Sequence, residues 1–205
     1  MTDSVATERP GKRDRLVDGA REAIYRQGVE ATTIADIAAA ADVPVGNVYY
    51  FKSKDELVTA ALDSYAREFQ ELLSSLEQQH RTPKARLKAL VQLLVSESDQ
   101  VARFGCPRGS LCSELDKQDS GLARAGRELM LTPASWIEEQ FREMGRRDAR
   151  ELAFAVLASY EGIALLTNTF RDPEVIIRER RRLQRWIDSL ARDHEAAPKK
   201  GKLAV

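Results

Sequence analysis

The sequence predicts an all-α fold of about nine helices, with a short amino-terminal helix-turn-helix domain followed by a larger helical domain. Of the 205 residues, 43% are apolar, which is enough to bury a substantial core. Glycine and proline are sparse, at 11 and 7 residues, and no run of alternating β-branched residues indicates a strand. Apolar residues instead recur three or four positions apart, the spacing of a helix that buries one face.

Capping and breaking residues place the amino-terminal elements. We expect residues 1–12 to form a flexible arm and a first helix to cover about 13–27, with Gly28 just past its end. A second helix begins near Thr33, because Thr33 and Asp36 have the Thr-x-x-Asp spacing of a reciprocal cap.

A tight turn and a very short third helix come next. Residues 42–43 form the turn, and Pro44 suits the first position of a helix because its missing amide proton needs no partner there. The third helix covers about 44–50. Ser53 and Glu56 then form a Ser-x-x-Glu capping box, which begins a long helix towards residue 79. The helix-turn-helix domain is expected to span residues 13–57.

The larger domain is expected to span residues 58–192 and to be helical throughout. Its remaining helices are predicted over about 83–102, 111–117, 122–144, 148–169 and 173–191. We expect Pro133 to kink or split the helix that contains it. Residues 193–205 are predicted to be a polar, flexible tail.

Charge and composition narrow the functional classes. The net charge is zero, from 32 Lys and Arg against 32 Asp and Glu, so any nucleic-acid binding must come from a narrow surface. The amino-terminal residues lack the apolar segment of a signal peptide, and no apolar stretch approaches the ~20 residues that span a membrane. Two cysteines are too few for a secreted, disulfide-rich domain. We therefore expect a cytoplasmic protein with no membrane partner.

Catalytic patterns are missing from the sequence. There is no Ser/His/Asp set, no Gly-rich phosphate loop and no cluster of histidines with carboxylates. We expect no enzyme activity, no cofactor and no metal site. A helical interaction protein with no DNA role is a further alternative.

The segment 32–57 has the features of a DNA-binding surface. Two short helices joined by a three- or four-residue turn place the second helix in a position to enter a major groove, and amides at helix starts suit phosphates. The outward residues of the third helix are small or polar and then aromatic and basic, while Val48 and Phe51 are expected in the core. The candidate DNA contacts are Thr33, Pro44, Val45, Gly46, Asn47, Tyr49, Tyr50, Lys52 and Lys54.

This segment resembles the DNA-binding domain of TetR-family transcriptional repressors, over about residues 13–62. The resemblance lies in Ala31-Thr32-Thr33-Ile34-x-x-Ile37-Ala38, Ala41-Asp42-Val43, Gly46-Asn47-Val48-Tyr49 and Phe51-x-x-Lys54-x-x-Leu57. It implies a homodimer that binds a palindromic operator in double-stranded DNA and releases it when a small-molecule effector binds the larger domain. Thr33, Tyr49 and Lys54 match the family's phosphate-contacting positions, and residues 45–47 match its base-facing surface.

One position departs from the family pattern. The family has two residues between the tyrosine and the phenylalanine that closes the third helix, whereas here Tyr50 alone separates Tyr49 from Phe51. The loss of one residue rotates the next part of the chain by about 100° on an α-helix. Either the next loop absorbs this rotation, or the DNA contacts of Tyr50 and Lys52 differ from those of the family.

The larger domain offers a candidate effector region rather than a defined site. Its apolar and aromatic lining favours a hydrophobic effector. The candidate residues are Phe69, Phe104, Leu111, Glu114, Trp136, Phe141, Tyr160 and Asn168.

Cys106 and Cys112 allow a second interpretation of regulation. Their C-x5-C spacing does not match a metal site, but Arg108 between them would lower the pKa of a neighbouring thiol. A thiol- or electrophile-sensing repressor of the same fold is the alternative function. Two small buried residues without chemistry are the simpler interpretation.

The last two predicted helices are amphipathic, and in the TetR family such helices typically form a four-helix bundle between subunits. The short third helix would contact only half of an operator. A second, symmetric copy of the chain with its third helix ~34 Å away along the DNA would therefore raise the affinity for the operator. The candidate interface residues are Val156, Tyr160, Ile163, Leu183, Trp186, Ile187 and Leu190. The basic segment 178–185 is expected to be a solvated helix face with neighbouring acids.

Overall fold

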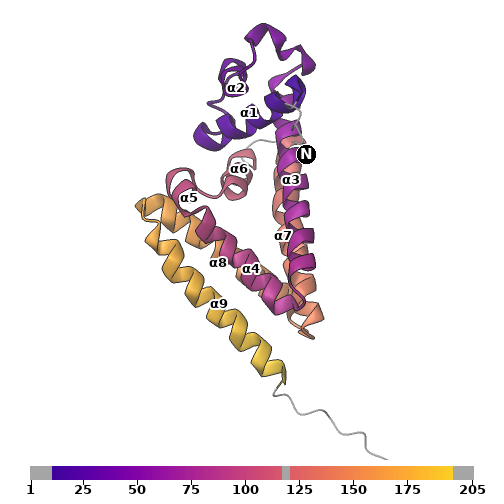
Figure 1. Ribbon diagram of the computed structural model, residues 1–205, viewed down its shortest axis with the longest axis vertical. Helices are drawn as coiled ribbons and strands as arrows, with labels where there is room; N and C mark the ends of the chain where they lie inside the picture. Colours follow the sequence, from indigo (N-terminus) through magenta and orange to yellow (C-terminus); the bar gives the residue numbers. More distant parts are fainter. Residues whose placement is uncertain (1–10, 117–120, 196–205) are drawn as a thin grey trace, which may run out of the picture. The chain divides into compact units, whose positions relative to one another are not determined.

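The structure is a computed structural model, which describes residues 11–116 and 121–195 (Figure 1). Within these ranges the chain forms nine α-helices, one 3₁₀ helix and no strand, which confirms the all-α prediction. The helices are α1 Lys12–Gln27, α2 Ile34–Ala40, the 3₁₀ helix η1 Val45–Tyr50, α3 Lys54–Gln79, α4 Pro83–Ser96, α5 Ser98–Phe104, α6 Pro107–Leu115, α7 Gly121–Glu143, α8 Ala149–Phe170 and α9 Glu174–Glu195. The predicted arm and tail lie almost entirely outside the described residues.

The chain divides into two compact units, and each is built from two stretches of sequence. Unit 1 combines Met1–Arg67 with Ser110–Leu129, and unit 2 combines Glu68–Gly109 with Met130–Val205, over their described residues. Helices α3, α6 and α7 therefore contribute residues to both units. The predicted domains, 13–57 and 58–192, were defined by expected function, and their bounds differ from those of the two compact units. The division by function stays a prediction.

The core of unit 1 joins the helix-turn-helix to residues far along the chain. Leu16 of α1, Ile37 of α2 and Leu57 of α3 have no exposed surface. The same cluster includes Leu111, Leu115, Leu122 and Leu129 from α6 and α7. Since apolar burial is the main stabilising contribution, the stretch 110–129 is an integral part of this unit rather than an attachment to it.

Helices α1 and α2 pack closely because α1 has a glycine where they meet. A Cβ atom added to Gly19 would lie 2.8 Å from the amide nitrogen of Ala41 and 2.8 Å from the carbonyl oxygen of Ile37. Real Cβ atoms do not approach backbone atoms so closely, and only glycine therefore permits this separation. The helix gives up about 1 kcal/mol of intrinsic propensity for it.

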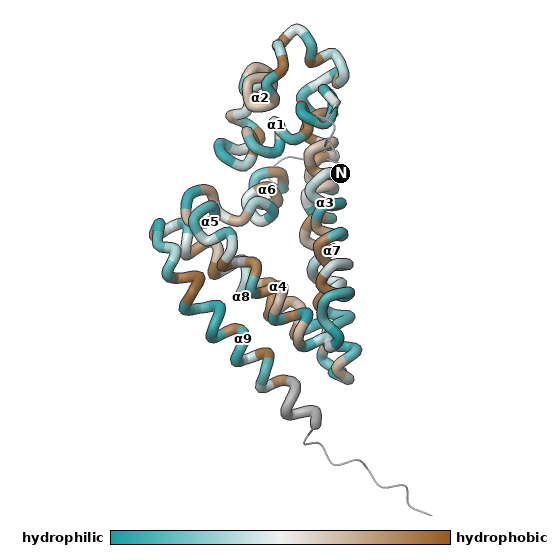
Figure 2. Tube along the Cα trace, viewed as in Figure 1, coloured by the Kyte–Doolittle hydropathy of each residue, from teal (hydrophilic) through white to brown (hydrophobic). Residues whose placement is uncertain are grey.

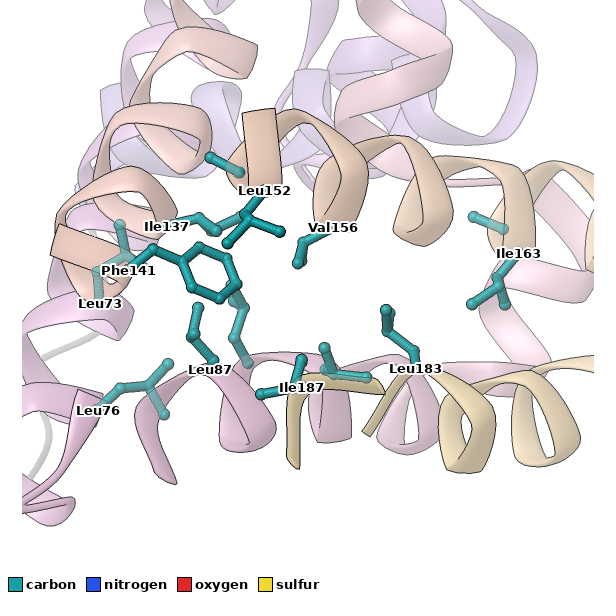
Figure 3. Packing of buried hydrophobic residues seen from close by; sticks show 14 of the residues in the cluster. Leu73, Leu76, Leu87, Ile137, Phe141, Leu152, Val156, Ile163, Leu183 and Ile187 are labelled. Carbon is teal, nitrogen blue, oxygen red and sulfur yellow. The ribbon is translucent and has the colours of Figure 1, made fainter. Parts of the chain in front are cut away.

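Unit 2 has a core of its own, contributed by parts of α3, α4, α5, α7, α8 and α9 (Figure 3). Phe141 and Leu87 face Ile187 in this core, and none of the three has exposed surface. Along α9, apolar and polar residues alternate as bands in Figure 2, which is the pattern of a helix with one buried face. Its buried face packs against α4 and α8.

Two predicted helices differ from the structure. The helix expected over 83–102 is two helices, α4 and α5, interrupted at Glu97. The hydroxyl of Ser96 donates to the carbonyl oxygen of Leu93 at 2.8 Å, and such a bond competes with the helical pattern. Pro133 lies inside α7, which continues through it as one helix, so the predicted split is wrong.

Helix α8 corrects the expectation that no apolar stretch approaches the length of a membrane span. In the part of the chain that the structure describes, it is the one helix with the length and composition of a membrane span, at a mean hydropathy of 1.3. Such evidence is weak, because the core helix of a globular domain passes the same test. Val156, Ile163 and Ala164 of α8 are buried in unit 2, while other apolar residues on the helix are exposed.

Candidate nucleic-acid interface

Thr33 and Asp36 form the predicted reciprocal cap at the start of α2. The Thr33 hydroxyl accepts a bond from the Asp36 amide at 3.2 Å, and the Asp36 carboxylate accepts from the Thr33 amide at 2.8 Å. The hydroxyl also donates to that carboxylate at 2.6 Å. These bonds from Thr33 lower the pKa of Asp36 below its usual range. A phosphate at this helix start would compete with Asp36 for the Thr33 hydroxyl.

The turn after α2 is held by a Schellman motif, in which the residue past the helix end is left-handed. The amide of Val43 donates to the carbonyl oxygen of Ala38 at 3.0 Å, and that of Asp42 donates to Ala39 at 3.2 Å. Asp42 has a φ of 52°, an unusual value for a residue other than glycine. A guanidinium nitrogen of Arg15 donates to the Asp42 carbonyl at 2.9 Å and fixes the turn to α1.

The 3₁₀ helix η1 exposes two of the three residues predicted to read bases, Val45 and Gly46, while the third, Asn47, is half-buried. Val48 is only 8% exposed and Phe51, three positions later, is also buried, so one edge of the segment is fixed in the core of unit 1. Val45 and Gly46 are exposed, and Tyr49 is 69% exposed. A Cβ atom on Gly46 would meet nothing within 4 Å, which leaves this position open to a close neighbour. Pro44 caps the segment rather than starting it, contrary to the prediction.

The 3₁₀ winding gives a physical account of the missing residue. Six residues at about 120° each turn the chain by about 720°, close to the roughly 700° of seven residues in an α-helix. A 3₁₀ winding of this length would therefore offset the rotation caused by the missing residue, a possibility not considered from the sequence. Tyr49 and Tyr50 stack with their ring centroids 4.7 Å apart, and both stay exposed.

Lysines 52 and 54 lie at the predicted cap of α3. The Glu56 amide donates to the Ser53 hydroxyl at 3.1 Å, and the Glu56 carboxylate accepts from the amide of Lys52 at 2.7 Å. The Lys52 side chain is exposed. The Lys54 ammonium donates to the carbonyl oxygen of Glu30 at 3.2 Å, so one of its three donors is already engaged.

Glu114 and Leu111 do not belong to the candidate effector region. The Glu114 carboxylate accepts from the amide of Val29 at 2.9 Å and from that of Glu30 at 2.7 Å, in the loop between α1 and α2. Leu111 is buried in the core of unit 1. Sequence reasoning missed this contact because its partners are more than 80 positions apart and carry no local signal.

The other candidate effector residues lie in unit 2 but have different environments. Phe141 is fully buried in the core. The Trp136 indole donates to Glu77 at 2.7 Å, and the amide of Asn168 donates to the carbonyl oxygen of Ala102 at 3.2 Å. Phe104 is half-buried at the end of α5.

Phe69 and Tyr160 belong instead to a polar cluster within unit 2. The Arg108 guanidinium lies over the Phe69 ring, 4.1 Å from its centroid, and interacts electrostatically with Tyr160, Cys106 and Glu161. Burial raises the pKa of both Tyr160 and Glu161. This cluster combines an aromatic surface with a cation and hydrogen-bonding groups.

Cys106 does not have the environment of a reactive thiol. Burial and then the nearby Glu161 carboxylate raise the pKa of Cys106 to about 12, and together they outweigh the opposing effect of Arg108. The Cys106 thiol lies 3.4 Å from Glu161, to which it donates. The Cys112 thiol donates to the carbonyl oxygen of Gly126 at 2.8 Å. Arg108 does lower the pKa of the Cys106 thiol, as expected, but burial and Glu161, 55 positions from Cys106, outweigh its effect, so the thiol is not activated.

Most of the candidate dimer residues lie in the core of unit 2. Side chains with almost no accessible surface do not meet a second copy directly, so we reassign them to that core. They are Val156, Ile163, Leu183, Ile187 and Leu190, while Tyr160 and Trp186 are partly buried against it. The basic segment of α9 has neighbouring acids, with Arg178 3.2 Å from Asp172 and Arg182 2.5 Å from Glu179.

Comparisons with known proteins agree with this geometry. The family model described as "Bacterial regulatory proteins, tetR family" matches residues 16–61. The chain is 24% identical over 189 residues to the HTH-type transcriptional regulator TtgR of Pseudomonas putida, covering 86% of this chain and 88% of the relative. It is 28% identical over 174 residues to the HTH-type transcriptional repressor DhaR of a Mycobacterium species, covering 79% and 85%.

The fold is also found among solved structures. A TetR transcriptional regulator from Legionella pneumophila superposes with a TM-score of 0.78 at 17% identity, over 89% of this chain and 98% of that one. The similarity extends from the helix-turn-helix through the larger helical part of the chain. The chain is therefore similar over most of its length to HTH-type and TetR transcriptional regulators, and its residues 16–61 match the model of the tetR family of bacterial regulatory proteins.

Proposed function

We propose that the protein is a transcriptional repressor that binds a palindromic operator as a homodimer and releases it when a small effector binds unit 2. The observation that carries this proposal is η1. Its inner edge is fixed by Val48 and Phe51, and its outer surface has an open glycine and an exposed tyrosine. Residues 45–47 would face base edges, while Thr33, Tyr49, Tyr50, Lys52 and Lys54 would contact the phosphate backbone.

Helix α8 supports the homodimer. Phe154 is 52% exposed and Leu165 and Phe170 are each 65% exposed, which is unusual for large apolar side chains in water. Phe154 and Leu165 are about three turns apart and share one face of the helix with Ala158 and Gly162 between them, and a Cβ atom on Gly162 would meet nothing within 4 Å. An apolar face with small residues allows close approach of the same face from a second copy.

The polar cluster of unit 2 supports an effector that is not purely hydrocarbon. Phe69 offers an apolar surface, whereas Arg108, Tyr160 and Glu161 offer hydrogen-bonding groups that fix a ligand's orientation. Binding there would select a conformation of the dimer with lower operator affinity. The raised pKa of the Cys106 thiol argues against the thiol-sensing alternative.

The decisive experiment measures binding of the purified protein to DNA from upstream of its own gene, by fluorescence anisotropy at several salt concentrations. We expect affinity that falls steeply with salt. Asn47→Ala or Tyr49→Ala should weaken binding about 5- to 150-fold, equivalent to about 1–3 kcal/mol. Lys52→Ala should reduce the salt dependence by about one released ion.

Gln78→Ala is the matched control for Asn47→Ala, because it removes an exposed side-chain amide from α3 outside unit 1. Its affinity should equal that of the wild type. The proposal would be excluded if the wild-type protein showed no salt-sensitive binding to this DNA. It would also be excluded if neither Asn47→Ala nor Tyr49→Ala weakened the binding.

A further inference from the structure

The chain changes direction between α2 and η1 at a single residue, Asp42. Its φ of 52° lies in the left-handed region, where the Cβ atom of an L-residue crowds the carbonyl oxygen that follows. Ala41 before it is still right-handed. Val43 after it is buried in the core of unit 1, and η1 begins two positions later. The backbone of Asp42 therefore sets the direction in which η1 leaves α2.

Glycine is the residue that most often occupies such a position, because it has no Cβ atom to crowd the backbone. Asp42 adopts the same conformation at a steric cost. The two backbone bonds of the Schellman motif form at helix ends of this kind whichever residue is left-handed, so they do not offset that cost. The contacts that are particular to this turn come from α1.

Arg15 of α1 supplies these contacts. One of its guanidinium nitrogens donates to the carbonyl oxygen of Asp42 at 2.9 Å and to that of Ala41 at 3.3 Å. These oxygens belong to the peptide groups on either side of the Asp42 Cα atom, so holding both restrains the φ and the ψ of this residue. Hydrogen bonds from a charged donor are stronger than neutral ones, and the Arg15 side chain is only 20% exposed.

The carboxylate of Asp42 contributes less to this arrangement than its backbone does. It lies 3.8 Å from the same guanidinium nitrogen and is 86% exposed. Water and salt weaken an exposed ion pair of this kind. Arg15 is therefore connected to the turn mainly through the two carbonyl oxygens, and substitutions at position 42 can remove the ion pair while they leave these bonds possible.

Gly19 explains why Arg15 reaches the turn. The two residues are four positions apart on α1 and share one face of the helix. At Gly19 the end of α2 comes so close that an added Cβ atom would lie 2.8 Å from the amide nitrogen of Ala41. Arg15, one turn earlier, lies beside the residues that leave α2. All of these residues, and η1, belong to unit 1.

We propose that Arg15 is a positioning residue for DNA binding, which holds Asp42 in its left-handed conformation and thereby directs η1. This inference rests on the proposed function, because it is the placement of η1 against base edges that Arg15 would control. In this role Arg15 does not contact DNA. It differs from a phosphate contact, which would act through its charge and would not depend on the backbone of Asp42.

The first test is a double-mutant cycle in the full-length protein. Asp42→Gly and Asp42→Ala both remove the carboxylate, but only glycine adopts the left-handed conformation freely. Arg15→Met should weaken binding to DNA from upstream of the gene about tenfold in the wild type and in Asp42→Ala, but less than about threefold in Asp42→Gly. The glycine variant no longer needs the two bonds from Arg15.

Arg15→Lys is measured in the same cycle. It keeps the charge but replaces the planar guanidinium by a flexible ammonium. It should show the same order of effects, with a larger loss of affinity in Asp42→Ala than in Asp42→Gly. This variant keeps the test decisive if Arg15→Met does not fold.

The salt dependence of binding separates positioning from a phosphate contact. Loss of one phosphate contact lowers the slope of log affinity against log salt by about one. Arg15→Met should weaken binding and leave this slope unchanged. A slope reduced by about one would show that Arg15 contacts a phosphate, and it would overturn the positioning role.

Amide hydrogen exchange, measured by NMR without DNA, tests the turn directly. The Val43 amide closes the Schellman motif across the turn, and the Gly28 amide closes the last turn of α1. Arg15→Met should speed exchange at Val43 and leave Gly28 unchanged, and addition of Asp42→Gly should slow exchange at Val43 again. Equal acceleration at both amides would indicate general destabilisation and would contradict the proposal.

Failure of this inference is distinguishable from failure of the proposed function. Equal effects of Arg15→Met in Asp42→Gly and in Asp42→Ala, or unchanged exchange at Val43, would overturn the role of Arg15. Wild-type protein that does not bind the upstream DNA would reject the proposed function, and exchange at Val43 would still decide whether Arg15 holds the turn.

Discussion

Replacing Gly19 by alanine tests how closely α1 and α2 must approach. The added methyl group would lie 2.8 Å from the amide nitrogen of Ala41, 2.8 Å from the carbonyl oxygen of Ile37 and 2.9 Å from the Ala41 Cβ atom. Two of these atoms belong to the backbone at the end of α2. They cannot turn aside as a flexible side chain would, so α2 itself must shift.

The magnitude results from two opposing effects. Alanine in place of glycine inside a helix stabilises it by about 1 kcal/mol. Overpacking costs about 1–3 kcal/mol, and three approaches below 3.0 Å place Gly19 at the upper end. We therefore expect a net destabilisation of unit 1 by about 2 kcal/mol, with weaker DNA binding because α2 also positions Thr33.

Urea unfolding followed by two probes measures this effect. Both tryptophans of the chain, Trp136 and Trp186, lie in unit 2, so their fluorescence reports that unit, while far-UV circular dichroism reports both. Gly19→Ala should lower the urea midpoint seen by circular dichroism more than that seen by fluorescence. The control is Gly121→Ala, because a Cβ atom there meets nothing within 4 Å. A Gly19→Ala protein that is more stable by about 1 kcal/mol, as helix propensity alone predicts, would refute the reasoning.

Four further changes probe other features. Gly46→Leu should leave the urea midpoint unchanged, since the position is open, yet weaken operator binding at least tenfold (~1.4 kcal/mol) in anisotropy measurements, because the side chain would occupy the space of a base edge. Asp36→Asn should make the free energy of unfolding fall less steeply as the pH is lowered below about 4. The pKa of Asp36 is lowered in the folded state, so this carboxylate stabilises the fold above the unfolded-state pKa near 3.8, and that stabilisation is lost as the pH falls through the folded-state pKa. Urea titrations that give the wild type and the variant the same pH dependence below about pH 4 would contradict this. Cys106 in the native protein should resist alkylation by iodoacetamide at pH 8, and mass spectrometry should find modification only after unfolding, because its pKa is about 12. Leu165→Asp should convert a dimer to a monomer in sedimentation velocity, whereas Arg181→Asp on an exposed part of α9 should not; a dimer that survives Leu165→Asp would place the interface elsewhere.

Local signals in the sequence were sufficient for the helix-turn-helix. The reciprocal cap at Thr33 and the capping box at Ser53 act over three residues, so the starts of α2 and α3 could be read from spacing alone. Val48 and Phe51 were expected in the core and are buried there. The all-α class also followed from periodicity and from the sparse glycine and proline, although the helix expected over 83–102 is divided at Glu97.

Features that depend on distant partners could not be read in this way. Glu114 was placed with the effector candidates because its position among apolar residues gave no hint of Val29 and Glu30. For α8, periodicity marked apolar positions on more than one face, and it did not distinguish the buried Val156 from the exposed Leu165. The raised pKa of Cys106 likewise depended on its burial in the folded chain and on Glu161, which is remote in sequence.

The composition of unit 1 has a consequence for how the protein is made. Its core needs Leu111, Leu115, Leu122 and Leu129 as well as the residues of the first helices. On a ribosome, these leucines emerge long after residue 67, so the head cannot complete its core while only the amino-terminal part of the chain has been synthesised. Residues 11–67 of unit 1 can complete their core only after residues 110–129 have left the exit tunnel, and the residues between these two stretches have left it before then. The core of unit 1 is therefore completed only after residues 110–129 have been made, well after the residues that would read DNA.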